Sequence, residues 1–330
     1  MDKNKTTGNI IKRLFFIGMK FRTWFILALI ISIVLALVSV YRPILTQQIV
    51  DIDIVKLKDR SLLIKHTYIL FALVVAETVL NFFLVFLSNY IAQNVIRDIR
   101  ERLYHKLIYF KTSFFDKTAI GNLVTRAVGD VETIATVYTD GFLMVFGDIL
   151  KVVFVLVAMF KVNIELSYIS LSILPIMLVI TRFFQKKLKK AFGDERAWTS
   201  TQNSFVQERL SGMSLIQVFN RQNAEYKKFD EINISLRGAL LKTVFYFSLF
   251  FPVVELISSV FIGLILFVAG YSALTARDIS PGQVIAFISY INMLIRPLRQ
   301  IADRFNNIQR GLVGAERVLG VMDEDNAMPN

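Results

Sequence analysis

Two acidic side chains lie inside long apolar stretches of the chain, where a charge is costly. Glu77 is the only charged residue between 67 and 91, and Glu255 is the only one between 243 and 276. With no opposite charge on its own helix, such a carboxylate could bind a lipophilic cation or carry a proton. The alternative for both is a hydrogen bond to a neighbouring helix, or an acid kept protonated by burial.

Other polar residues in these stretches repeat every three to four positions, which places them on single helical faces. A charge facing lipid at the bilayer midplane costs at least ~2.5 kcal/mol, so these faces should turn toward protein or water. We therefore expect them to line a substrate cavity together with Glu77 and Glu255. The further cavity candidates are Asn81, Ser259, Ser289, Asn292 and Arg296. Asp148 and Lys151, three residues apart, are expected to neutralise each other and to be structural.

Catalytic and metal chemistry find little support in the sequence. There is no Cys, and His66 and His105 fall in different loops, so no metal site is predicted. Gly311 and Gly314 lie close together, but the Lys-Ser/Thr pair of a phosphate-binding loop does not follow them. We therefore predict no catalytic and no cofactor-binding residue in this chain, which alone would not hydrolyse ATP.

The composition is that of a membrane protein. The 330 residues are 55% hydrophobic and 19% charged, with a formal charge of +12. Soluble domains average about 45–50% apolar and about 25% charged residues. A soluble enzyme is therefore disfavoured. The basic charge alternates with long apolar runs instead of forming one polar surface, so no nucleic-acid partner is predicted.

Six stretches are long and apolar enough for helices that cross a hydrocarbon core, which takes about 20 residues. This predicts an all-α membrane protein with a cytoplasmic arm and interfacial helix over 1–23 and a six-helix domain over 24–310. A linker follows over 311–330. The expected spans are 24–46, 67–91, 138–160, 166–181, 243–276 and 279–295.

The distribution of Lys and Arg predicts the orientation of these spans. The N-terminal arm, two long loops and the C-terminal tail hold thirty of them, and the three short loops on the other side hold six. Basic loops stay in the cytoplasm, so both termini should be cytoplasmic in a cell membrane. Richness in Ile, Lys and Asn favours a bacterial source.

The two long loops are predicted to be helical hairpins that extend well beyond the membrane. Residues 67–110 contain neither Gly nor Pro, and a helix of that length reaches about 66 Å, roughly twice the bilayer core. Apolar side chains at the far ends of such hairpins need a partner surface, unless they pack on their own hairpin. The tip residues are Ser113, Phe114, Phe115 and Asp116 in the first loop, and Ser211, Gly212, Met213, Ser214, Leu215, Ile216 and Phe219 in the second.

Three motifs resemble those of one family when they are taken in order. The first is SFFD at 113–116, followed by GNL at 121–123, Arg126 and Asp130. The second is QERLSGMSLIQVFNRQNAEYKKF at 207–229, and the third is AERV at 315–318 with Asp323. Together they resemble the transmembrane domain of multidrug-resistance-type ATP-binding-cassette exporters, which have the type IV exporter fold. The resemblance covers nearly the whole chain.

The resemblance implies a mechanism and partners. In that family the two tips are coupling helices that dock on nucleotide-binding domains, and the fourth and fifth spans swap into a second transmembrane half. By carry-over, this chain would belong to a homo- or heterodimer that uses Mg-ATP bound elsewhere. Residues 311–330 would lead to a nucleotide-binding domain that is absent from this chain, because it is truncated or separately encoded. The expected function is ATP-driven export of amphipathic or lipophilic compounds, of the multidrug or lipid type, by alternating access.

A secondary, ion-coupled transporter is the alternative function. Such transporters are typically built from internal repeats with helices interrupted at the midplane. The sequence shows no convincing repeat, and long cytoplasmic hairpins would have no purpose in that mechanism. Substrate identity stays open at this stage, beyond contact with membrane lipids and a small amphipathic molecule.

Overall fold

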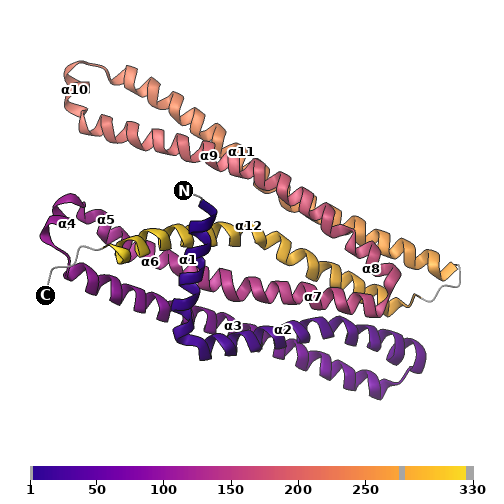
Figure 1. Ribbon diagram of the computed structural model, residues 1–330. Coiled ribbons are helices and arrows are strands. Elements are labelled where there is room, and N and C mark those ends of the chain that lie inside the picture. The colour runs from indigo at the N-terminus through magenta and orange to yellow at the C-terminus, as the bar shows by residue number, and fades with distance from the viewer. Residues whose placement is uncertain (1–2, 275–278, 325–330) are drawn as a thin grey trace. The chain divides into compact units, whose positions relative to one another are not determined.

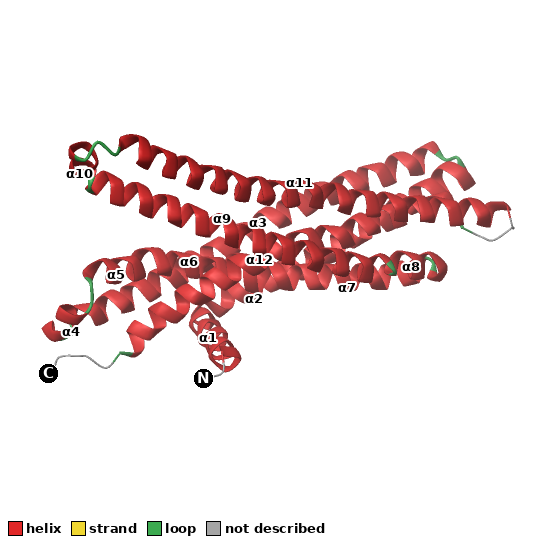
Figure 2. Ribbon diagram, turned by 90° about the horizontal axis from the view of Figure 1, so that it is seen from above, coloured by secondary structure: helices red, strands yellow, loops and turns green. Residues whose placement is uncertain are grey.

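The computed structural model describes residues 3–274 and 279–324, and their regular structure is helical (Figures 1 and 2). The chain divides into two compact units. One comprises Met1–Ser167 together with Leu266–Asn330, and the other is Tyr168–Ile265. The second unit contains most of the hairpin made by the expected fourth and fifth spans, and the end of α11 from Leu266 onward is counted with the first unit.

Long apolar helices dominate both units. Five helical stretches of the described residues are long and apolar enough to cross a membrane. The first four contain the first four expected spans, and the fifth covers most of the expected span 243–276, of which residues 275 and 276 lie outside the described residues. The five stretches are Gly8–Leu57, Arg60–Ile108, Ile120–Val162, Ile164–Ser211 and Gln222–Ser272. The expected sixth span lies at the start of α12 (Pro281–Asp323), where basic residues follow from Arg296 onward, so this crossing stays a prediction.

The first unit is an assembly of long helices joined by short turns. Its α3 is 49 residues long, about 74 Å, because no Gly or Pro interrupts it and the carboxylate of Asp59 caps its first turn at Ser61. Its elements are α1 (Lys3–Gly18), η1 (Met19–Phe21), α2 (Arg22–Gln48), η2 (Ile49–Leu57), α3 (Arg60–Ile108), α4 (Thr112–Lys117), α5 (Ile120–Thr125), η3 (Arg126–Asp130), α6 (Val131–Thr136), η4 (Val137–Leu143), α7 (Met144–Val162) and α12.

The second unit is a helical hairpin. Its arms are α9 (Ile173–Ser211) and α11 (Gln222–Leu274), joined by the short α10 (Met213–Val218). The preceding α8 (Ile164–Leu171) ends just before α9 begins, so Pro175 falls in the first turn of α9, where a missing N–H breaks no helical hydrogen bond.

The buried core of the first unit lies in the half that carries the first tip. The C-terminal half of α3 packs there against α6, η4, α12 and α1. The opposite half also buries apolar side chains, such as Phe287 and Leu294 of α12, but many others there are exposed, as expected of helices whose solvent is lipid. Core members include Leu84, Ile91, Val95, Ile99, Leu103, Val131, Ile134, Tyr138, Ala315 and Val318.

Two glycines let α12 approach its neighbours closely. A Cβ at Gly311 would lie 2.5 Å from Val137 Cγ2 and 2.7 Å from the carbonyl oxygen of Thr133. At Gly314 it would lie 2.8 Å from the carbonyl oxygen of Asp130. These glycines therefore serve helix packing, which explains their presence without a phosphate-binding loop.

The N-terminal helix lies across the long helices of its unit (Figure 1). Leu14 is fully buried, and its carbonyl oxygen accepts a hydrogen bond of 2.6 Å from the Tyr138 hydroxyl. Phe15 and Phe16 stay exposed on the other side of α1. One face of α1 is thus fixed to the protein while aromatic side chains remain available to an interface, as expected of an interfacial helix.

Candidate functional site

The first expected tip forms the short helix α4 in the first unit. Ser113, Phe115 and Asp116 are exposed, but Phe114 is half-buried and packs against the core of its unit. Its ring lies 4.6 Å from that of Phe110, which is fully buried. The first tip is therefore held by its own unit, with only part of its surface free.

An apolar face that sequence reasoning missed continues beyond this tip. Ile120, Val124 and Val128 are 69%, 55% and 60% exposed, and they repeat every four residues along α5 and η3. The spacing is visible in the sequence. It was not distinguishable from a core-facing stripe because both give the same helical period.

The second expected tip forms α10 at the end of the hairpin (Figure 2). Leu215 and Phe219 are 62% and 69% exposed, whereas Gly212 and Ile216 are half-buried. Val218, at 78%, and Leu210, at 65%, were not predicted and belong to the same exposed apolar surface. We call Leu210, Leu215, Val218 and Phe219 the tip patch.

The turn after α10 depends on Asn220, whose φ of 51° is left-handed. Asparagine tolerates this conformation better than most residues. The turn is closed by two backbone hydrogen bonds, from the Asn220 N–H to the Gln217 carbonyl and from the Arg221 N–H to the Ile216 carbonyl, of 3.1 and 3.0 Å. Asn220 thus reverses the chain so that α11 returns beside α9.

A charged clasp joins the two arms of the hairpin next to the tip patch. Arg209 on α9 donates a 2.5 Å hydrogen bond to Glu225 on α11, and its guanidinium lies 4.7 Å from the Phe205 ring centroid. The hydrogen bond from Arg209 lowers the pKa of Glu225 below its usual value. The clasp fixes the spacing of the arms, so the tip patch is presented on a braced support.

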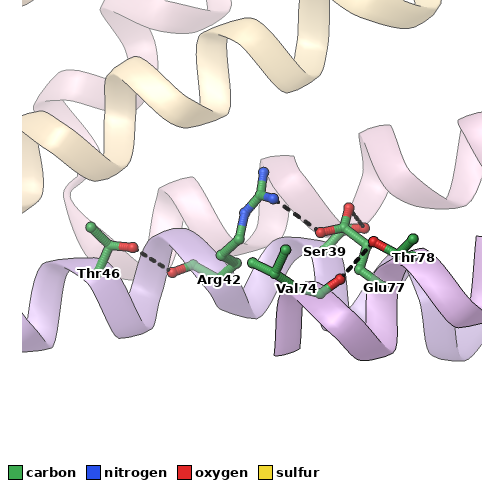
Figure 3. A network of polar contacts seen from close by, with 6 residues as sticks. All are labelled: Ser39, Arg42, Thr46, Val74, Glu77 and Thr78. Atoms are coloured by element: carbon green, nitrogen blue, oxygen red, sulfur yellow. Dashed lines mark hydrogen bonds and ion pairs between the residues drawn. The ribbon is translucent and has the colours of Figure 1, made fainter. Parts of the chain in front are cut away.

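Polar contacts between α2 and α3 surround Glu77 (Figure 3). Ser39 donates a 2.7 Å hydrogen bond to one of its carboxylate oxygens, and Arg42 forms a 3.1 Å ion pair with the other. Both partners come from α2, one turn apart. Glu77 therefore makes hydrogen bonds to a neighbouring helix, as in the alternative to cation binding or proton transfer. Its negative charge is compensated by Arg42.

The expected pairing of Asp148 with Lys151 is only part of the observed arrangement. Asp148 on α7 forms a 2.5 Å ion pair with Arg304 on α12. The charges of Glu77, Arg296, Arg42 and Asp148 all act on Lys151. A contact between helices is thus added to the attraction along α7, because packing brings α12 against α7.

The remaining cavity candidates are distributed over both units. Asn81 is exposed on α3, and the side chains of Ser289 and Asn292 bond to carbonyls of their own helix, those of Ile285 and Ile288. Glu255 and Ser259 are exposed on α11 in the second unit. Glu77 and Arg296 therefore lie in the first unit, and Glu255 lies in the second.

The end of α12 is anchored to the N-terminal helix. Arg13 donates hydrogen bonds of 2.5 and 2.8 Å to Asp323, and these lower the pKa of that carboxyl below its usual range. Lys106 on α3 donates a 2.6 Å hydrogen bond to the Met322 carbonyl. The predicted linker over 311–330 is thus held against α1 and α3 at Met322 and Asp323, where α12 ends.

Long apolar helices, a helical N-terminal arm across them and two extended hairpins with short terminal helices define a multi-pass α-helical membrane domain. Residues 25–298 match the model of the ABC transporter transmembrane region. The chain belongs to this family, and it has the all-α type IV exporter fold.

Several bacterial proteins are similar to this chain. It is 28% identical to an ATP-dependent lipid A-core flippase of Pseudoalteromonas translucida over 78% of this chain and 44% of that protein. It is 26% identical to the ABC transporter ATP-binding protein YknU of Bacillus subtilis, over 95% and 53%, and to the multidrug resistance-like ATP-binding protein MdlA of Buchnera aphidicola, over 91% and 52%. The chain spans about half the length of these curated relatives.

Proposed function

We propose that this chain is the substrate-translocating transmembrane half of an ATP-driven exporter of amphipathic or lipophilic compounds. The names of the relatives support this proposal, since they include a lipid A-core flippase and multidrug resistance-like and ATP-binding proteins. The single observation that carries it is the tip patch, an exposed apolar surface on a braced hairpin. Exposed apolar patches of this kind mark sites of interaction with a partner.

The partner in this proposal is a nucleotide-binding domain that holds Mg-ATP. Closure of two such domains would push on α4 and α10, and the long hairpin arms would carry the movement into the membrane. The cavity would then change from inward-facing to outward-facing access. The clasp of Arg209 and Glu225 supports this transmission, because it keeps the two arms from sliding apart under load.

A second transmembrane half completes the proposed transporter. The division of the chain into a main unit and the separate hairpin Tyr168–Ile265 supports a domain-swapped dimer in which this hairpin packs on the other half. In the proposed topology both termini are cytoplasmic, residues 24–310 form the membrane domain and 311–330 lead toward the nucleotide-binding domain. The bacterial sources of the relatives support a bacterial cell membrane as its location.

The test is ATP-dependent uptake of a fluorescent amphiphile into inverted membrane vesicles that contain the whole transporter. The paired substitution Leu215→Ser and Phe219→Ser should reduce uptake about tenfold or more, because it removes the apolar anchors of the tip patch. Ile234→Ser is the matched control, since Ile234 is also exposed (54%) on α11 but lies away from the tip. Uptake that follows an ion gradient without nucleotide, and that ignores both variants, would favour the secondary transporter instead.

A further inference from the structure

The last turn of α12 is held by two other helices of the first unit. Arg13 on α1 donates hydrogen bonds of 2.5 and 2.8 Å to the two carboxylate oxygens of Asp323. Lys106 on α3 donates a 2.6 Å hydrogen bond to the Met322 carbonyl. The point at which the chain leaves α12 is thus tied to α1 and α3.

Asp323 lies at an unfavourable place for a carboxylate. It is the last residue of α12, where the helix dipole has its negative end, and the last turn of this helix contains no basic residue. The residue that follows, Glu324, is acidic as well. Local preference therefore works against a helical turn at this point, and the direct contact that compensates comes from Arg13, 310 residues away in the sequence.

Arg13 is presented from a helix that is itself fixed. Its neighbour Leu14 is fully buried, and the Leu14 carbonyl accepts a 2.6 Å hydrogen bond from the Tyr138 hydroxyl. Just beyond the end of α1, Lys20 forms an ion pair with Asp98 of α3. The guanidinium therefore approaches the end of α12 from a braced position.

Stability alone does not account for this pair. The Arg13 and Asp323 side chains are 41% and 54% exposed, and exposed ion pairs contribute little to the free energy of folding. The apolar side chains of Val318, Leu319 and Val321 already bury the end of α12 in the core of the first unit. The pair adds direction, because a guanidinium that donates to both carboxylate oxygens fixes the orientation of the two groups.

We propose that Arg13 and Asp323 are positioning residues, which keep the last turn of α12 helical and fixed to α1 during transport. A movement of the nucleotide-binding domain that the proposed function places after α12 would then displace α12 itself. Without the pair, the last turn would unwind and absorb part of the movement. This inference rests on the proposed function and deepens it by naming how force reaches α12 from the chain that follows.

Amide hydrogen exchange of the whole purified transporter tests the anchor itself. In Arg13→Gln, we expect the amides at 320–323 to exchange about tenfold faster, the scale of one hydrogen bond to a charged group. Lys12→Gln is the matched control, since Lys12 is an exposed cation of the same helix, and it should leave these amides protected. Unchanged exchange in Arg13→Gln would overturn the proposal whatever the transport result.

The ratio of substrate taken up to ATP hydrolysed tests the positioning role. Inverted vesicles that contain the whole transporter give both rates. We expect this ratio to fall about threefold or more in Arg13→Gln and in Asp323→Asn, and to fall no further when the two are combined, because residues that act as a pair are not additive. A purely stabilising contact would lower both rates with the amount of folded protein and leave the ratio unchanged.

Reversal of the two charges gives an independent check. The double variant Arg13→Asp and Asp323→Arg restores the pair in the opposite sense, so its ratio should exceed that of either single change. The restoration should be incomplete, because the charge of Lys106 acts on position 323 and would repel an arginine there. A reversed pair with a ratio no better than those of the single changes would overturn the proposal.

The two measurements separate this inference from the proposed function. Absence of ATP-driven uptake in the parent would refute the exporter function, and the coupling role with it, even if the exchange result is as expected. ATP-driven uptake in the parent with equal ratios in Arg13→Gln and Lys12→Gln would overturn the positioning role alone. A further loss in the combined variant would show that the two residues act separately, and would overturn the pair.

Discussion

The two hairpin tips differ in how much of their own unit supports them. In α4, Phe114 packs against the fully buried Phe110, so the tip is part of a core. In and just after α10, Leu215, Val218 and Phe219 are mostly exposed, and a clasp and a turn brace the tip. The first tip is therefore fixed by its own packing, whereas the second presents most of its apolar surface outward, which is the surface that the proposed partner would cover.

The largest expected effect is a loss of nucleotide-dependent uptake when a charge is placed in the second tip, and a smaller loss when it is placed in the first. Val218→Asp should abolish nucleotide-dependent uptake, because a charge would replace the most exposed apolar member of the tip patch at the proposed interface. The matched change Phe115→Asp in α4, where the side chain is 38% exposed, should reduce uptake less. Uptake by whole transporters in inverted vesicles measures both. Equal losses would remove the functional difference between the tips.

The second prediction concerns the core that supports the first tip. Gly314→Ala should lower the free energy of unfolding by about 1–3 kcal/mol, because the methyl group would overlap with the backbone at Asp130. Gly238→Ala on α11 is the control, since a Cβ there meets nothing within 4 Å. Thermal unfolding in detergent measures the change. A Gly314→Ala protein as stable as the control would contradict the close approach of α12.

A third prediction compares two adjacent aromatic residues of α4. Phe114→Ala should destabilise the first unit by about 1–2 kcal/mol, a part of the cost for a fully buried Phe, because its ring is half-buried against the core. Phe115→Ala should change stability by less than about 0.5 kcal/mol, as is usual for an exposed side chain. Denaturant titration of both variants would detect the difference, and the reverse order would show that the ring contacts are misassigned.

The smallest expected effect is on the clasp of the second hairpin. Because the Glu225 pKa is lowered in the fold, its contribution to stability is present above the usual carboxyl value of 4.5 and is lost as pH falls through the lowered pKa. The protection of the amides at 205–229 against exchange, taken relative to the intrinsic rate at each pH, should therefore decrease as pH falls below about 4.5. In Arg209→Gln this loss of protection should be absent, and a parent-like acid response in that variant would exclude the clasp as its cause.

Local patterns were sufficient to predict the helices and the hairpin tips. An uninterrupted run without Gly or Pro predicted one long helix over 67–110, where α3 spans Arg60–Ile108, and the predicted second tip contains α10. These features depend on neighbours in sequence. The expected role of the tips and of the cavity residues stays a prediction, because no partner or ligand tests it.

Contacts between helices could not be predicted in the same way. The partner of Asp148 is Arg304, 156 residues away, and the partners of Glu77 lie on the preceding helix. Such pairs depend on which helices pack together and in which register. The exposure of Val218 was missed for a related reason, since an apolar residue in a short helix has the same sequence signal whether a core or a partner covers it.

The proposed docking of the second tip is tested most directly by chemical labelling. The chain contains no Cys, so V218C introduces a single thiol at the centre of the tip patch. We predict rapid reaction with a membrane-impermeant maleimide from the cytoplasmic side when the nucleotide-binding domain is removed, and protection when it is present. I234C is the control and should react equally in both. Equal reactivity of V218C with and without that domain would contradict docking at α10.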